Sequence, residues 1–277
     1  MSQDVTLLEG LLPHRVRWAQ AVIPELPADP AAAEQAYPEA IEAGLFPEER
    51  EHIARSVAKR RVEFAAVRRC ARRALQELGY PPVPILPGEQ REPRWPEGVV
   101  GSMTHCAGYC AAAVARSGEV SALGIDAEVH APLPEGVLEL ISLESERALI
   151  ARLAERGPGT VHWDRVLFSA KESVYKAWFP LTRRWLGFEQ ADIELRLDGT
   201  FEARLLTTDG DVAPAAANGS SSAAATSARA NAALPSASAT PISSPSFSSG
   251  SGIPRGFNGR WAVSGGLIAT AIGEVVG

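Results

Sequence analysis

The chain of 277 residues carries 33 acidic and 27 basic side chains, a net charge of −6, and 45% hydrophobic residues. This composition is typical of a folded protein, and its acidic balance argues against a general nucleic-acid binder, which would be expected to lean basic. The odd number of cysteines, 3, argues against a disulfide framework and for a reducing compartment. No basic and apolar leader and no run of about 18 apolar residues occurs, so we expect a soluble, cytoplasmic protein without a membrane segment.

Helices are expected first in residues 5–12 and 31–43, and then in one long segment, residues 47–78. Apolar residues of the long segment recur at helical spacing, and Gly79 follows as a C-terminal stop signal. Its opposite face is strongly basic, and consists of Arg55, Lys59, Arg60, Arg61, Arg68, Arg69, Arg72 and Arg73. Such a face is either simply solvated or binds phosphate, because guanidinium groups grip phosphate oxygens in pairs.

After a proline-rich, extended stretch at 81–96, strands are predicted at residues 111–116 and 122–126. The turn at 117–120 would join them as a hairpin. The second strand delivers Asp126 and Glu128 to its C-terminal end. Because residues two apart on a strand point to the same side, these two carboxylates share one face, as a divalent cation requires.

A further helix is predicted from Ser169 to the residue before Pro180. Ser169 is a suitable N-cap with Glu172 three residues later, and proline disfavours continuation of a helix. Residues four apart share a helix face, so Glu172 lies beside Lys176. Taken alone, this pair is more typical of a solvated helix stabiliser than of a catalytic site.

Two hairpins are predicted in the remainder of the chain. Apolar residues alternate on both sides of Asp198-Gly199, and again on both sides of Gly265-Gly266, so the second hairpin is expected to join the sheet of the first. Between them, residues 213–256 consist mostly of Ala, Ser, Gly, Pro and Thr. This segment is interpreted as a disordered insertion without a catalytic role, because it has too little apolar surface to offset the entropy of ordering.

Three motifs carry a family resemblance: GSMTH at 101–105, GIDAE at 124–128 and FSAKESVYK at 168–176. In this order and spacing they resemble the signature of the 4′-phosphopantetheinyl transferases, in particular the enterobactin-synthetase and surfactin-type branch common in actinobacteria. The resemblance implies an α/β fold of two similar halves related by a pseudo-twofold axis. The halves are expected at residues 1–118 and 119–277, the second containing the 213–256 insertion.

The resemblance also implies an activity and a ligand set. Such an enzyme moves the 4′-phosphopantetheine arm of coenzyme A onto a serine of an apo acyl or peptidyl carrier protein and releases 3′,5′-ADP. Asp126, Glu128 and Glu172 match the positions that bind Mg²⁺, for which Mn²⁺ can substitute. The matching catalytic residues are Glu172, as base for the serine hydroxyl, with Lys176 and Asp126. The matching coenzyme A contacts are Arg60, Arg68, His105, Lys171 and Lys176 for the phosphates, and Phe168, Tyr175 and Trp185 for the arm.

Alternatives remain at this point. A catalytically inactive scaffold that binds carrier proteins would share the motifs, and a metal-dependent nuclease also combines carboxylates with lysine. His105 could be a purely structural histidine. Relatives often have a lysine before the Trp95-Pro96 turn where this chain has Pro87, so contacts to the adenosine end of coenzyme A are not assigned. We expect a monomer that binds coenzyme A and a carrier protein, and neither nucleic acid nor a membrane.

Overall fold

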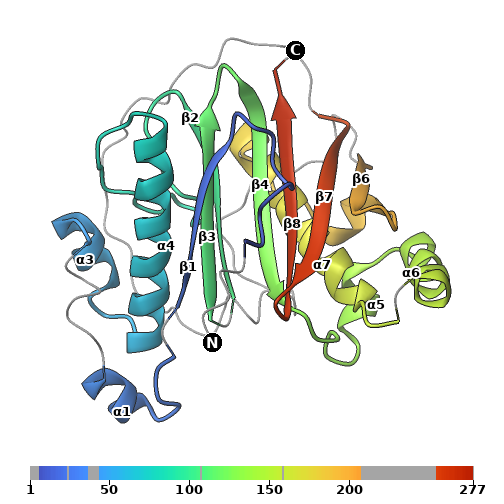
Figure 1. Ribbon diagram of the computed structural model, residues 1–277, viewed down its shortest axis with the longest axis horizontal. Helices are drawn as coiled ribbons and strands as arrows, with labels where there is room; N and C mark the ends of the chain where they lie inside the picture. Colours follow the sequence, from blue (N-terminus) through green and yellow to red (C-terminus); the bar gives the residue numbers. More distant parts are fainter. Residues whose placement is uncertain are drawn as a thin grey trace.

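The computed structural model describes residues 6–23, 25–36, 44–106, 108–157, 159–206 and 254–276. Within these residues the chain forms two antiparallel sheets that lie side by side, each covered by one long helix (Figure 1). The helices are α1 Pro30–Gln35, α3 Pro47–Ile53, α4 Ala58–Glu77, α5 Val137–Ile141, α6 Glu144–Arg156, α7 Trp163–Thr182 and the 3-10 turn η1 Phe188–Gln190. The strands are β1 Arg17–Val22, β2 Val99–Cys106, β3 Tyr109–Arg116, β4 Val120–Val129, β5 Ala191–Leu195, β6 Thr200–Leu205, β7 Gly256–Ser264 and β8 Leu267–Val275.

The first sheet has three strands in the order β1-β3-β2. Helix α4 packs on β1 and β3, and its apolar face is completely buried in a core that also includes Cys110 and Val114 of β3. This burial explains why the helix forms here: side chains at helical spacing, such as Phe64, Ala71 and Leu75, all reach the same sheet. The opposite face of α4 keeps most of its arginines exposed or half-buried.

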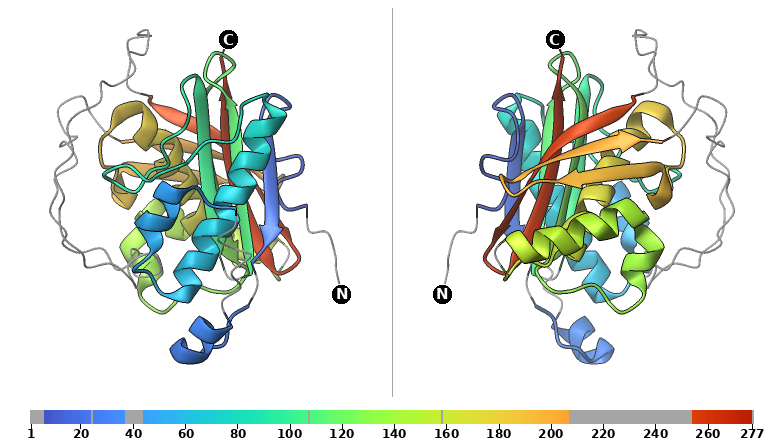
Figure 2. Two further views of the ribbon diagram at one scale, coloured as in Figure 1. Left: turned by 90° about the vertical axis from the view of Figure 1, so that its left-hand side faces the viewer. Right: turned by 90° about the vertical axis from the view of Figure 1, so that its right-hand side faces the viewer.

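The second sheet has five strands in the order β4-β8-β7-β6-β5, so the predicted hairpins at 193–205 and 261–271 are confirmed as parts of one sheet. Helix α7 packs on β4 and β8. In the right-hand view of Figure 2, the yellow-green α6 lies below the gold and orange strands β5 and β6. Trp178, which is completely buried, is among the residues at the centre of this second core.

A third core joins the two sheets. The face of β3 that carries Ala111 and Ala113 packs with Leu123 and Ile125 of β4, together with N-terminal leucines such as Leu8. Alternate residues of β3 and of β4 therefore serve different cores, as the period of two in a strand requires. The two α/β units predicted from the family resemblance are confirmed in this arrangement.

Side-chain hydroxyls connect β2 to β4, two strands that no ladder of backbone hydrogen bonds pairs. The backbone N–H of Ile125 donates to Ser102 Oγ at 3.0 Å, and that of Ala127 donates to Thr104 Oγ1 at 2.9 Å. Ser102 and Thr104 are two residues apart, so both hydroxyls point toward the same neighbour. We call this line of contacts the seam between the halves.

Gly124 allows α7 to approach β4 unusually closely. A Cβ atom at this position would overlap the backbone oxygen of Ser173 and lie 2.9 Å from the backbone N of Ala177. Any larger residue would push the helix away from the strand. The close contact places the side chains of α7 against the carboxylate end of β4.

Several sequence predictions are wrong in detail. The predicted helix at 47–78 is two helices, α3 and α4, because the chain turns between Ala54 and Val57; Gly79 does follow its end, with a φ of 83°. The strands at 111–116 and 122–126 do not pair as a hairpin. Both neighbours of β3 are β1 and β2, so no edge of β3 remains for β4, which pairs with β8.

The helix predicted from Ser169 begins six residues earlier, at Trp163, and passes through Pro180 to Thr182. The buried side chains on both sides of Ser169 and up to Phe179 outweigh the local signals for a start and a stop, because tertiary packing overrides propensity. Residues 6–12 form turns instead of a helix, and α1 ends at Gln35. The insertion predicted at 213–256 lies outside the described residues except for its last three, which lead into β7.

All three cysteines fall within the described ranges and are free, with Cys70 Sγ 3.8 Å from Cys110 Sγ, in agreement with the prediction of no disulfide framework. None of the helices in the described part of the chain is long and apolar enough to cross a membrane.

Candidate active site

Asp126 stands at the point where β4, α7 and the seam meet. Its side chain is buried, with only 6% of its surface exposed. Lys176 Nζ donates to Oδ1 at 2.7 Å, Ser169 Oγ donates to Oδ2 at 2.8 Å, and Thr104 Oγ1 lies 3.3 Å from Oδ1. Thr270 of β8 also contacts Ser169, at 3.0 Å between the two hydroxyl oxygens. The carboxylate is therefore held in one orientation by both halves of the molecule.

Glu128 and Glu172 are the two other carboxylates of this region. Burial and the neighbouring charge of Asp126 raise the pKa of Glu172 to about 7, and raise that of Glu128 to about 7 as well. Glu172 contributes to the shift at Glu128, so all three carboxylates repel one another. Such repulsion disfavours the charged forms unless a cation is present.

The three carboxylates are not gathered as a finished metal site. Among the residues that the structure describes, no group of three His, Cys, Asp or Glu side chains is close enough to hold a metal ion. Two of the carboxylates form ion pairs with cationic side chains instead. Asp126 pairs with Lys176, and Glu128 Oε2 lies 3.1 Å from Nη1 of Arg165. The donor chemistry nevertheless fits a hard divalent cation, because all three groups are carboxylate oxygens with unfavourable mutual repulsion.

A cluster of cations faces the carboxylates from the other half. Arg60 of α4 lies with Nη1 3.1 Å from Nε2 of His105 on β2, and the buried Arg68 donates to the backbone oxygen of Ile85 at 3.2 Å. Burial and the charge of Arg60 lower the pKa of Arg68 to about 9. Burial and the charges of Arg60, Lys176 and Arg68 lower the pKa of His105 to about 4. We call Arg60, Arg68 and His105 the cation cluster; at neutral pH its positive charges are those of the two arginines, because its lowered pKa leaves His105 neutral.

The lowered pKa values of the cation cluster indicate what it binds. Burial lowers the pKa of all three members, the charge of Arg60 adds to the effect at Arg68 and His105, and a bound anion would reverse these shifts. Guanidinium groups match the geometry of phosphate oxygens. The cluster is therefore suited to a phosphate-bearing ligand.

Lys176 lies between the three carboxylates and the cation cluster. Burial alone would lower the pKa of its ammonium group, but the carboxylates of Asp126 and Glu172 raise it above the ordinary value. Lys176 also donates to the backbone oxygen of Ile125 at 3.1 Å, which fixes its position at the end of β4. Its charge acts on His105 as well, so it belongs to both sides of the seam.

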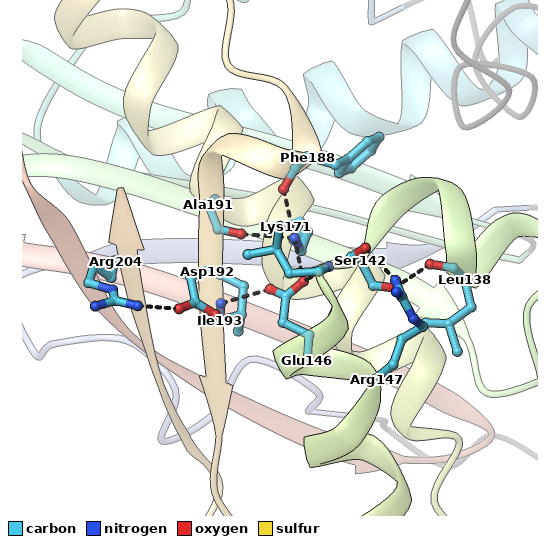
Figure 3. Close-up of polar contacts among 11 residues, drawn as sticks. Leu138, Ser142, Glu146, Arg147, Lys171, Phe188, Ala191, Asp192, Ile193 and Arg204 are labelled. Atoms are coloured by element: carbon cyan, nitrogen blue, oxygen red, sulfur yellow. Dashed lines mark hydrogen bonds and ion pairs between the residues drawn. The ribbon is translucent and has the colours of Figure 1, made fainter. Parts of the chain in front are cut away.

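Lys171, for which a phosphate contact is predicted, has protein groups as its partners in the structure. Lys171 is only 3% exposed, and its Nζ lies 2.8 Å from Glu146 Oε2 and donates to the backbone oxygens of Phe188 and Ala191 at 2.7 and 2.8 Å (Figure 3). All three of these partners belong to the C-terminal half. Lys171 and Glu172 are adjacent on a helix and therefore point in different directions. The sequence alone does not show which partner each of them meets.

The three aromatic residues predicted for the arm differ in exposure. Phe168 is only 8% exposed and belongs to the core, where its ring packs on that of Phe188 at 6.1 Å between centroids. Tyr175 is half-buried, and its ring lies 5.2 Å from that of Trp185, which is 54% exposed. Of these three residues, only Tyr175 and Trp185 thus offer surface to a ligand.

Three residues of the site escaped sequence reasoning. Local signals favour Ser169 as a helix cap, but it lies inside α7 and donates a hydrogen bond to Asp126. Thr104 belongs to the GSMTH motif, and its alternation with Ser102 is the one signal in the sequence for a shared partner. Arg165 gave no signal, because its contact with Glu128 depends on the turn that follows β4.

The geometry defines a class of protein. Two α/β halves bring a cation cluster and a carboxylate–lysine group to one seam, an arrangement suited to an enzyme that transfers a phosphate-linked group. Comparisons with known proteins narrow this class.

Residues 48–115 match the model of the 4′-phosphopantetheinyl transferase N-terminal domain, and residues 122–228 match that of the 4′-phosphopantetheinyl transferase superfamily. The chain is 43% identical over 260 residues to 4′-phosphopantetheinyl transferase Npt of Nocardia iowensis, covering 89% of this chain and 96% of the relative. It is 61% identical over 163 residues to 4′-phosphopantetheinyl transferase Svp of Streptomyces mobaraensis, covering 58% of this chain and 66% of the relative. With 4′-phosphopantetheinyl transferase PptT of Mycobacterium tuberculosis it shares 60% identity over 155 residues, 56% of this chain and 67% of the relative.

The chain therefore belongs to the 4′-phosphopantetheinyl transferase family, and the expected family resemblance is confirmed. It is a transferase enzyme of the class that moves phosphopantetheine to carrier proteins.

Proposed function

We propose that this transferase takes the 4′-phosphopantetheine arm from coenzyme A, delivers it to the serine of an apo acyl or peptidyl carrier protein, and releases 3′,5′-ADP. The observation that carries the proposal is the meeting of the cation cluster with Asp126 and Glu172 at one seam. Coenzyme A supplies phosphates for the cation cluster to bind. The bond that Asp126 and Glu172 would act on is the pyrophosphate bond of coenzyme A.

Arg60, Arg68 and His105 are proposed to bind the phosphates of coenzyme A. Support comes from the lowered pKa values of all three groups, which a phosphate dianion would raise again. Lys176 is proposed to stabilise the negative charge that grows on the departing phosphate. A cation held by carboxylates at the edge of the cluster suits that role.

Glu172 is proposed as the base that accepts the proton of the carrier serine. A half-buried carboxyl with a pKa of about 7 is matched to proton transfer near neutral pH. Asp126 is proposed to act beside it as a fixed negative charge, since Ser169 and Lys176 hold its two oxygens. The serine oxygen would then attack the phosphorus that carries the arm, and the bond to the second phosphate would break.

Asp126, Glu128 and Glu172 are proposed to hold Mg²⁺, with Mn²⁺ as a substitute. Their oxygen donors and mutual repulsion support this assignment. When bound, the cation would neutralise charge on the pyrophosphate. Equilibrium dialysis with Mn²⁺ tests the assignment without an activity measurement: the wild type should retain Mn²⁺ and the Glu128→Gln and Glu172→Gln variants should retain less.

Tyr175 and Trp185 are proposed to contact the pantetheine arm, and the buried Phe168 to contribute from the core. We also propose that the boundary between the halves lies near residue 118, supported by the short turn between the end of β3 at Arg116 and the start of β4 at Val120. A monomer in the cytoplasm, without nucleic acid or membrane as partner, is part of the same proposal.

The experiment that tests the function is a mass measurement on the product. The protein is incubated with coenzyme A, Mg²⁺ and a panel of apo carrier proteins of the fatty-acid, polyketide and peptide-synthetase types. Transfer adds about 340 Da to the carrier, the mass of the phosphopantetheine arm. A carrier that binds but gains no mass would favour the inactive scaffold. Relative rates across the panel identify the preferred carrier.

A further inference from the structure

The buried ion pair of Lys171 and Glu146 is a feature that the proposed chemistry does not use. Each side chain of the pair is only 1% exposed. Glu146 Oε2 also accepts from the backbone N–H of Leu143 at 2.7 Å, and Oε1 accepts from that of Ile193 at 2.8 Å. Lys171 gives its remaining donors to the backbone oxygens of Phe188 and Ala191 (Figure 3). Every partner is satisfied, so the pair forms a rigid junction of α6, α7 and β5.

The junction lies at the end of the segment that carries Trp185. This segment, residues 183–190, leaves α7 at Arg183 and returns to the sheet at β5. The buried side chain of Leu186 anchors its middle in the core, and two hydrogen bonds from α7 hold its backbone on either side. The indole N–H of the buried Trp178 donates to the backbone oxygen of Arg184 at 3.0 Å, and Lys171 donates to that of Phe188 at 2.7 Å. Between these points Trp185 is exposed and packs on Tyr175.

We infer that Lys171 is a positioning residue for the pantetheine arm: through Phe188 it holds the 183–190 segment so that Trp185 stands beside Tyr175. The inference rests on the proposed function, since it concerns where the arm of coenzyme A binds. It replaces the expected phosphate contact of Lys171 with a role at the opposite end of the ligand. Lys171 itself touches no substrate, because its ammonium group is enclosed by protein oxygens.

The test separates the two ends of the ligand. 3′,5′-ADP carries the phosphates of coenzyme A without the arm, so the ratio of the two dissociation constants, 3′,5′-ADP over coenzyme A, measures what the arm contributes. The Lys171→Met and Glu146→Gln double variant removes both charges together, which avoids leaving one buried charge without its partner. We expect this ratio to fall about five- to tenfold, as for the loss of an ordered aromatic contact, while the binding of 3′,5′-ADP stays within about twofold of wild type.

A matched control is available in the other half. Arg72 and Glu49 form a comparable pair at 2.9 Å, and Glu49 is likewise completely buried. The Arg72→Met and Glu49→Gln double variant should lose stability without changing the ratio, because its pair does not hold the 183–190 segment. Thermal unfolding of both variants shows whether each is folded at the temperature of the binding measurement.

A second variant acts on the same segment and leaves the ion pair intact. Trp178→Phe removes the hydrogen bond to Arg184, and it should lower the same ratio in the same direction. Equal losses for both ligands in the Lys171→Met and Glu146→Gln protein would assign Lys171 to the phosphates and overturn the inference. A wild-type ratio in that folded protein, or in Trp178→Phe, would also overturn it. If the wild type binds neither ligand, the proposed function has failed instead.

Discussion

In each half of the molecule, a glutamate at the third position of a short helix ties a long helix to the segment that follows it. In the N-terminal half, Glu49 of α3 accepts from Arg72 of α4 at 2.9 Å and from the backbone N–H of Ile85 at 2.8 Å. It also accepts from the backbone N–H of Phe46 at 2.9 Å, which completes the first turn of its own helix.

The C-terminal half repeats this plan. Glu146 of α6 pairs with Lys171 of α7, accepts from Ile193 of β5, and accepts from Leu143 at the start of its own helix. The glutamate-centred contacts are the same in both halves, but the charged side chains at the seam differ. Helix α4 presents arginine toward β2, whereas α7 presents Glu172 and Lys176 toward β4. One architecture used twice thus places arginines on one side of the seam and carboxylates on the other.

The close contact of helix and strand is special to the C-terminal half, and breaking it should have the largest effect. Gly124→Ala would drive a methyl group into the backbone of Ser173, at a cost of about 3 kcal/mol or more in the free energy of unfolding. Transfer activity should fall below detection as Lys176 and Ser169 move away from Asp126. Chemical denaturation measures the first effect and the carrier mass assay the second.

Gly118→Ala is the matched control, because no atom lies within 4 Å of a Cβ at that position. It should unfold and react like the wild type. A Gly124→Ala protein of normal stability and activity would show that the close approach is not needed.

Removing the proposed base, Glu172, should abolish the reaction proposed for the C-terminal half and preserve the phosphate binding proposed for the N-terminal half. For Glu172→Gln we expect kcat to fall about 10²- to 10⁴-fold, the usual contribution of a positioned base. The dissociation constant of 3′,5′-ADP, measured by calorimetry without added metal, should change little. A variant that keeps near-normal turnover would refute the role assigned to Glu172.

The converse change affects the N-terminal half. Arg60→Met should raise the KM for coenzyme A about 10- to 100-fold through the loss of a charged contact to phosphate, with a smaller effect on kcat. Arg73→Met, on an exposed part of the same helix, is the control and should keep the wild-type KM. Steady-state kinetics at constant ionic strength distinguish the two. An unchanged KM in Arg60→Met would remove Arg60 from the binding site.

The hydroxyl that orients Asp126 should have a more modest effect. Ser169→Ala removes the hydrogen bond to Asp126 Oδ2, worth about 1 kcal/mol, and should lower kcat about fivefold. Ser173→Ala is the control on the same helix, since its hydroxyl donates to the backbone oxygen of Ala170. Measurements of kcat for the two variants in parallel test this role. Equal values would mean that Ser169 does not position the carboxylate of Asp126.

The smallest effect is a shift in the titration of His105. Its pKa is about 4 in the free protein, and bound phosphate should raise it by about 1 unit or more, because negative charge favours the imidazolium form. Nuclear magnetic resonance of the imidazole with and without 3′,5′-ADP measures the shift.

The same lowered pKa has a consequence for stability. Below the ordinary value of 6.5 the unfolded chain binds a proton at His105 before the folded protein does, so stability is lost as the pH falls from 6.5 toward 4. A His105→Gln variant should show a weaker loss over this range. In the titration with 3′,5′-ADP, an unchanged pKa of His105 would show that the phosphate binds away from His105.

The sequence by itself determined the family, the two-unit α/β fold, and the local elements in which apolar spacing is regular, such as the apolar face of α4 and the hairpins on both sides of Gly199 and Gly265. It also determined that Asp126 and Glu128 share a strand face and that Glu172 and Lys176 share a helix face, because both facts follow from the periods of strand and helix. The assigned site roles remain predictions.

Only the tertiary structure decided which of these faces meet. Ser169 is a good helix cap by local rules, but burial on both sides places it inside α7 against Asp126. Lys171 and Lys176 are alike in the sequence, yet one is enclosed by Glu146 and two backbone oxygens while the other reaches Asp126. Local spacing fixes the direction of a side chain relative to its own helix. The partner that the side chain meets depends on how elements distant in the chain pack together. Here the close packing of α7 on β4 is permitted by a single glycine, Gly124.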